Sequence, residues 1–215
     1  MTLSSIVMAV IAGICVAQMK LARVAAEQVA TAEAVRTVVS VLGGEARRMH
    51  SADVRAWSAD SLAVRAFRGA GLPCGSTGGG VIVRYTGDRL PDPAKDSVLI
   101  VGAGLEYALL LFDASPAPGL CAALSGETVL ELTTTGTPPQ DAVLLVFESG
   151  SYHLTTNALR YRIGAGGRQP LTAEALRHPF SRFDGLTQDG VSFRIEAGGR
   201  QAMYAAMFTP SPVWP

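Results

Sequence analysis

A long stretch without proline at the start of the chain constrains the fold more than any other feature. The first proline is Pro73, and no glycine lies between Gly13 and Gly43. Most residues between positions 3 and 48 have good helix propensity. A continuous helix over this stretch would be roughly 70 Å long at about 1.5 Å per residue. Because an average globular helix has only about 11–12 residues, we expect the rest of the chain to be organised around one long helix.

The two halves of this predicted helix differ in chemistry. Residues 6–17 are apolar on every side, so this half has no stripe that faces water. The nearly apolar stretch 1–19 lies at the lower edge of the length that crosses a membrane, and we interpret it as a membrane span. Residues 20–50 are instead amphipathic, with seven-residue spacing that predicts packing along another helix or a globular domain. The two spaced series are Leu21, Gln28, Val35 and Leu42, and Val24, Thr31 and Val38.

Residues 51–215 form the second part, and their pattern is that of a β-rich head. Short alternating runs are separated by glycine and proline turns, which is typical of antiparallel sheets. We expect a glycine-rich loop over 69–80 and one helical turn over 172–177 with Thr172 as its N-cap. The expected strands are 54–58, 61–67, 81–85, 97–101, 107–112, 128–133, 142–148, 151–155, 158–163, 191–196 and 202–208. The predicted fold class is α+β, with a long N-terminal helix packed on a small antiparallel head.

Three cysteines and few histidines limit the possible metal and disulfide chemistry. Cys15 lies in the apolar segment and is interpreted as a small hydrophobic residue. Outside the cytoplasm, a Cys74–Cys121 disulfide would close a loop of about 47 residues and stabilise the fold by about 2–4 kcal/mol; otherwise these are two unrelated thiols. The histidines are isolated, which gives no zinc pattern. Asp184 and Asp189 are foremost turn formers, with calcium binding as the alternative. We predict no cofactor and no metal.

Catalytic motifs are missing from the sequence, and we predict that the chain is not an enzyme. It contains no G-x-S-x-G, H-E-x-x-H or Walker pattern. Residues 98–104 resemble the start of a dinucleotide fingerprint, but Tyr107 stands where a third small residue is required. We therefore predict that the strand is followed by a turn and a returning strand, and we reject the nucleotide site as the less favoured alternative. The formal net charge is zero, which predicts no nucleic-acid partner. The scattered arginines are interpreted as solvated faces and local pairs.

The N-terminus resembles that of type IV pilins and type II secretion pseudopilins. Thr2 and Leu3 match the start of the mature family sequence, and Met1 is an accepted variant of its first residue. Ser5 departs from the usual glutamate, and the proline common near position 22 is absent. A second tract, over residues 143–208, is similar to minor pseudopilins of the J type, with Gln169-Pro170-Leu171 and Asp189-Gly190 as its clearest parts.

This resemblance implies a structural subunit of a pilus-like or pseudopilus filament. Such subunits are held in the bacterial inner membrane, extracted by an assembly machine and exported into a periplasmic or cell-surface filament. Met1 would be the processed and methylated residue, exposed by removal of a basic leader. Copies of the chain or related pilins would be the partners, packed through Leu3, Ile6, Val10, Ile14, Leu21, Val24 and Val35. The alternative is a membrane-anchored extracytoplasmic binding domain on a helical stalk.

Overall fold

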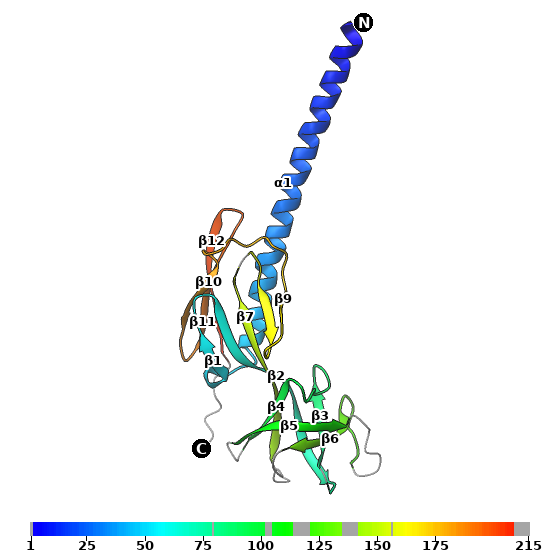
Figure 1. Ribbon diagram of the computed structural model, residues 1–215, viewed down its shortest axis with the longest axis vertical. Coiled ribbons are helices and arrows are strands. Elements are labelled where there is room, and N and C mark those ends of the chain that lie inside the picture. Colours follow the sequence, from blue (N-terminus) through cyan, green and yellow to red (C-terminus); the bar gives the residue numbers. More distant parts are fainter. Residues whose placement is uncertain are drawn as a thin grey trace.

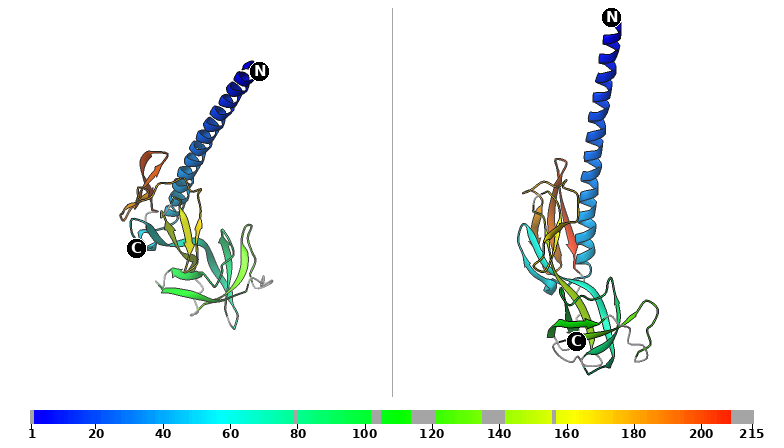
Figure 2. Two further views of the ribbon diagram at one scale, coloured as in Figure 1. Left: turned by 45° about the horizontal axis from the view of Figure 1, so that its top comes forward. Right: turned by 45° about the vertical axis from the view of Figure 1, so that its right-hand side comes forward.

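The structure is a computed structural model that describes residues 2–78, 80–101, 105–113, 121–134, 142–155 and 157–208. The long helix α1 (Thr2–Ala46) is a rod whose C-terminal end is packed on a β-rich head (Figure 1). The head has two lobes. One lies beside the last turns of α1 and the other lies beyond the end of the helix, as the two rotated views confirm (Figure 2).

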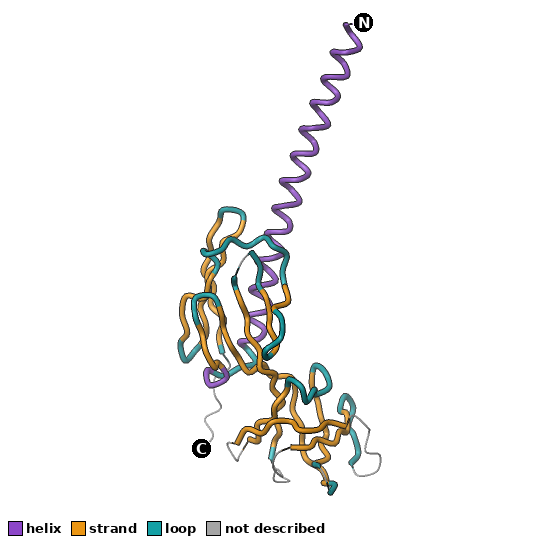
Figure 3. Tube along the Cα trace, viewed as in Figure 1, coloured by secondary structure: helices purple, strands orange, loops and turns teal. Residues whose placement is uncertain are grey.

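Twelve strands and one short 3₁₀ helix, η1 (Ser51–Asp53), make up the described part of the head (Figure 3). The first six strands are β1 (Val54–Trp57), β2 (Ser61–Ser76), β3 (Val81–Gly87), β4 (Asp96–Val101), β5 (Leu105–Asp113) and β6 (Thr128–Thr134). The other six are β7 (Val143–His153), β8 (Arg160–Ile163), β9 (Arg168–Pro170), β10 (Arg182–Leu186), β11 (Gly190–Ala197) and β12 (Arg200–Met207).

The distal lobe is a closed antiparallel barrel. Its strands run in the order β2, β3, β6, β5, β4 and β7, and β7 also pairs with β2. Gly69 shows the closure, because it pairs with Gly87 of β3 on one side and with Val146 of β7 on the other. Closure leaves no free strand edge in this part of the sheet. The barrel core consists of Val81, Val83, Tyr85, Val98, Ile100, Leu130, Leu132, Ala142, Leu144 and Val146.

The lobe beside the helix has a separate core. The long strands β2 and β7 continue out of the barrel and form a sheet with β1, β8 and β9, while β10, β11 and β12 form a second sheet. Four helix residues spaced four apart face this core, because that spacing places side chains on one side of a helix. They are Ala34, Val38, Leu42 and Ala46, all at most 3% exposed. They belong to one cluster with Leu62, Val64, Tyr152, Phe183, Phe193 and Ile195.

The predicted fold class is wrong in one respect, which is the membrane span. In the described residues no helix has an apolar stretch of the length needed to cross a membrane. The other parts of the class, a long N-terminal helix and an antiparallel β-rich head, are present.

Several local expectations also differ from the structure. The first part of the glycine-rich segment expected as a loop, residues 69–76, is strand instead, because β2 continues to Ser76 and pairs with β3. Two separately expected strands are one, because β7 pairs with β2 from Leu144 to His153 without stopping at Gly150. No helical turn forms over 172–177; Leu176 instead makes a single bridge with Ala197 of β11. The segment that follows residues 102–104 in the sequence is strand β5, not the helix that a dinucleotide site requires.

Candidate functional site

The free half of the helix is the most unusual surface of the molecule. Figures 1 and 2 show the N-terminal part of α1 projecting far beyond the head, while its C-terminal part lies beside the strands. Its large apolar side chains are between 47% and 70% exposed: Val7, Met8, Val10, Ile11, Ile14, Val16, Met19, Leu21, Val24 and Val29. A continuous apolar surface of this kind marks an interaction site rather than ordinary protein surface. We call residues 7–29 of α1 the free helix half.

The predicted packing positions fall on this surface in an ordered way. Val10, Ile14, Leu21 and Val24 are exposed and lie four, seven and three residues apart, which are spacings that keep residues on one side of a helix. We call this line of residues the seam. Val35 lies further along and is packed against the core of the helix-side lobe. Met1 lies outside the described residues, and so do the side chains of Leu3 and Ile6. The head thus covers one end of the seam and leaves the other uncovered.

A groove begins where the seam meets the head. It has a volume of about 1090 Å³ and lies between α1 and the hairpin of β11 and β12. Val24, Val35 and Val39 line its helix side, while Ile195, Ala202 and Tyr204 are among the residues that line the hairpin side. Because Val24 belongs to both the seam and the groove, the two surfaces are continuous. A segment lying along the free helix half would reach apolar groups on the head as well.

A buried ionic network fixes the base of the helix to both lobes. At its centre is Glu148 of β7, whose side chain is 4% exposed. Glu148 Oε1 lies 3.1 Å from Arg68 Nη2 and accepts a hydrogen bond of 2.6 Å from the Tyr161 hydroxyl. Arg68 Nη1 is also 3.6 Å from Glu45 of α1, and the Tyr152 hydroxyl donates to Glu45 Oε2 at 2.9 Å. The last turn of α1 is thereby joined to β2, β7 and β8.

The barrel lobe contributes the other half of this network. Arg89 Nη2 lies 2.7 Å from Glu148 Oε2 and 2.6 Å from Asp96 Oδ1. Burial opposes ionisation of Glu148, but hydrogen bonds from Tyr161, Arg68 and Arg89 outweigh it and hold its pKa below the usual range. Burial also raises the pKa of Tyr85 to about 12. One ionised carboxylate therefore connects the two lobes and fixes the direction in which the helix leaves them.

Comparison with protein-family models, with curated proteins and with solved structures gives no match. The site is therefore interpreted from its own geometry. The sequence interpretation missed the ionic network, since it treated the arginines as solvated faces and local pairs. Local pairs do occur, as between Arg182 and Asp184. Arg68 is in fact only 15% exposed.

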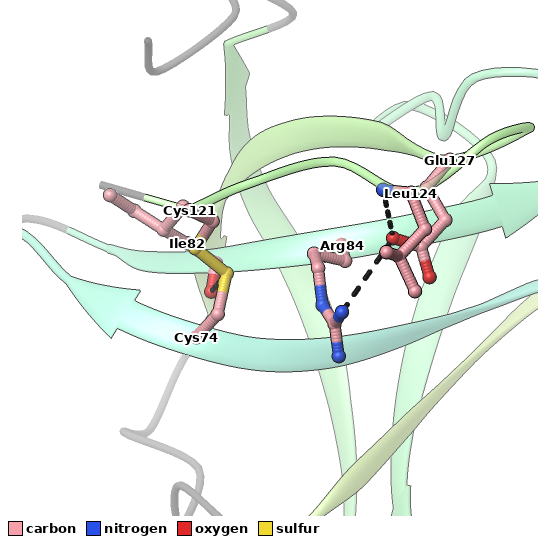
Figure 4. Close-up of a disulfide and its surroundings, with 6 residues drawn as sticks. All are labelled: Cys74, Ile82, Arg84, Cys121, Leu124 and Glu127. Atoms are coloured by element: carbon pink, nitrogen blue, oxygen red, sulfur yellow. Dashed lines mark hydrogen bonds and ion pairs between the residues drawn. A yellow bond between two sulfur atoms is a disulfide. The ribbon is translucent and has the colours of Figure 1, made fainter. Parts of the chain in front are cut away.

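The predicted disulfide between Cys74 and Cys121 is present, across a sequence separation of 47 residues (Figure 4). It ties the segment that starts at Cys121 to β2 in the barrel lobe. Next to it, the Leu124 amide donates to Glu127 Oε2 at 2.9 Å, and the same oxygen is 3.9 Å from Arg84 Nη1. Cys15, in contrast, is a free and exposed thiol on the free helix half.

Metal chemistry finds no support in the described part of the chain, where no group of three or more histidine, cysteine or acidic residues lies close enough to hold an ion. Asp184, considered above as a calcium ligand, is paired with arginines. Its carboxylate lies 2.9 Å from Arg182 Nε and 3.1 Å from Arg194 Nε. The described surface instead carries exposed apolar side chains along the free helix half.

Proposed function

We propose that the chain is a structural subunit of a pilus-like or pseudopilus filament, assembled by bundling the N-terminal helices of neighbouring copies or related subunits. The observation that carries this proposal is the uncovered free helix half, which projects from a head that is fixed to its other end. The resemblance of the N-terminus to pilins supports the same function and implies a dedicated assembly machine as a further partner.

The distribution of apolar groups favours a filament over a simple dimer. Exposed apolar side chains lie on all sides of the helix between Val7 and Met19, so one neighbouring helix would leave part of this surface in water. Burying a Val, Leu or Ile side chain completely contributes about 1.5–3 kcal/mol. Neighbours on several sides bury more of this surface. When identical subunits contact each other through different faces, the assembly is a ring if the rotation between neighbours closes. If the rotation does not close, the assembly is an open helical filament.

The disulfide supports an exported location for the head. Structural disulfides persist in oxidising compartments such as the periplasm and the cell surface, and they are rare in the cytosol. The Cys74–Cys121 bond joins Cys121 to β2 in the barrel lobe. This lobe lies beyond the end of the helix that would bundle (Figure 1). In a filament of this design the helices form the core and the two-lobed heads form the outer surface.

The proposal is tested on filaments sheared from the surface of cells that express the chain. We expect the tryptic peptide 1–20 in the sheared fraction to carry a methyl group on the amine of Met1, as the resemblance to pilins implies. The disulfide-linked peptides that contain Cys74 and Cys121 provide the internal control, because they report the recovery of the head from the same fraction. Finding the chain only in the unsheared cell fraction, with an unmodified Met1, would contradict this function.

A further inference from the structure

The sheet of β7, β8 and β9 carries a cluster of cationic side chains on the face that points away from the helix. Ser151 of β7 pairs with Arg162 of β8, which pairs with Arg168 of β9. His153 pairs with Arg160 in the next row of the same face. Paired residues and residues two apart share a face of a sheet, so all five side chains lie together. The opposite face carries Tyr152 and Tyr161, which serve the ionic network.

Two buried nitrogen atoms in this cluster have no hydrogen-bond partner among the described residues. His153 is 5% exposed, and its Nδ1 has no hydrogen-bond partner in the described part of the structure. The Nε of Arg162 is also buried and also has no hydrogen-bond partner among the described residues. His153 Nε2 lies 2.8 Å from Ser151 Oγ. If the hydroxyl donates to Nε2, the proton of a neutral imidazole resides on Nδ1, which makes Nδ1–H a donor that lacks an acceptor.

The side chains around these two nitrogen atoms carry more positive than negative charge, because Glu174 is the one carboxylate described beside the three arginines of the cluster. Arg160 is paired with Glu174 at 3.0 Å. Within the described ranges, the hydrogen bond that Arg168 Nη1 makes is to the neutral hydroxyl of Thr155, at 3.4 Å. Burial lowers the pKa of His153, and the charges of Arg168 and Arg162 lower it further. A buried polar group without a partner is unfavourable, so both the donors and the charges favour an anionic acceptor here.

We propose that Arg162, Arg168 and the Ser151–His153 pair form a binding site for a small oxyanion of the phosphate or sulfate type. Arginine suits this ligand because its planar fork of N–H donors matches two oxygens of one anion. The Nδ1–H of His153 supplies a further donor from the floor of the cluster. This site lies on the face of the sheet opposite to α1, and it is independent of helix bundling.

The test uses the full chain, titrated with inorganic phosphate and separately with phenyl phosphate. Binding is followed by calorimetry and by the NMR signals of the His153 imidazole. We expect the His153 signals to shift and to reach saturation as the anion is added. In Arg162→Gln the affinity should fall by roughly tenfold or more, because one charge-assisted hydrogen bond is removed. Arg55→Gln is the matched control. It removes an exposed arginine from β1, at the other end of the same sheet, and should bind as the wild type does.

The two ligands separate the possible sources of the anion. Binding of both indicates a free oxyanion, and binding of phenyl phosphate alone indicates a phosphoryl group on a larger molecule. Arg168→Gln, at an exposed position, serves as a second variant if Arg162→Gln does not fold. The proposal is overturned if neither ligand shifts His153, or if both arginine variants bind with wild-type affinity.

Discussion

Replacing Glu148 by alanine is expected to lower the free energy of unfolding by about 3–5 kcal/mol, the usual loss when one partner of a buried ion pair is removed. The substitution leaves Arg68 and Arg89 without the carboxylate that lies 3.1 and 2.7 Å from them. It also removes the acceptor of the Tyr161 hydroxyl. Equilibrium unfolding by denaturant, followed by circular dichroism at neutral pH, measures the loss.

Asp88→Ala is the matched control for this experiment. It removes a carboxylate that pairs with Arg48, but the two side chains are 53% and 55% exposed, and such pairs contribute less than about 1 kcal/mol. Equal losses in the two variants would show that the network does not stabilise the junction of the lobes.

The same network makes a prediction about pH. Because the folded-state pKa of Glu148 is lowered from its ordinary value of 4.5, its contribution is complete above that value and is lost as the pH falls through the lower folded-state pKa. The stability difference between wild type and Glu148→Ala should therefore shrink in acid, as measured by repeating the unfolding at low pH.

Replacing Ile14 by glutamate is expected to abolish assembly of the full chain. Ile14 is 52% exposed in the single chain, so the substitution should leave the fold of the head unchanged. In a helix bundle it would bury a charge without a partner, which is strongly unfavourable. Sedimentation and negative-stain electron microscopy after detergent removal give the readout.

Leu90→Glu is the control for the Ile14 variant, since it places the same charge at a similarly exposed apolar position. Leu90 is 49% exposed and lies in the connection between β3 and β4, outside the free helix half. We expect this variant to assemble as the wild type does. Assembly of Ile14→Glu at the wild-type level would mean that the free helix half is not the contact surface.

Much of the fold was predictable because its determinants are local. The absence of proline before Pro73 predicts the long helix, and alternating runs around short turns predict the hairpins of β1 with β2 and of β11 with β12. The membrane span was wrong because the prediction rested on a stretch at the lower limit of length. The glycine-rich end of β2 was missed because pairing with β3, a tertiary contact, overrides the weak strand propensity of glycine.

The candidate sites also differ in whether local sequence or long-range pairing determines them. Leu21 and Val24 were predicted from their spacing, since a helix converts spacing directly into a shared face. Val10 and Ile14 were predicted from the resemblance to pilins. Packing of these residues against another subunit stays a prediction. The ionic network has no such pattern: Arg68 and Glu148 are 80 residues apart in sequence and meet only because β2 and β7 pair along their lengths. Likewise, the cluster around Arg162 and His153 depends on the pairing register of β7, β8 and β9, which local sequence patterns do not reveal.

The thiol of Cys15 provides the most direct measurement of the central proposal. It lies on the free helix half, and the other two cysteines are held in the disulfide, so a maleimide reagent reports on Cys15 alone. Labelling of the full chain is compared by mass spectrometry between the dispersed protein and the sedimented assembly. Helix bundling predicts rapid labelling in the dispersed state and strong protection in the assembly. Equal labelling in both states would contradict burial of this helix between subunits.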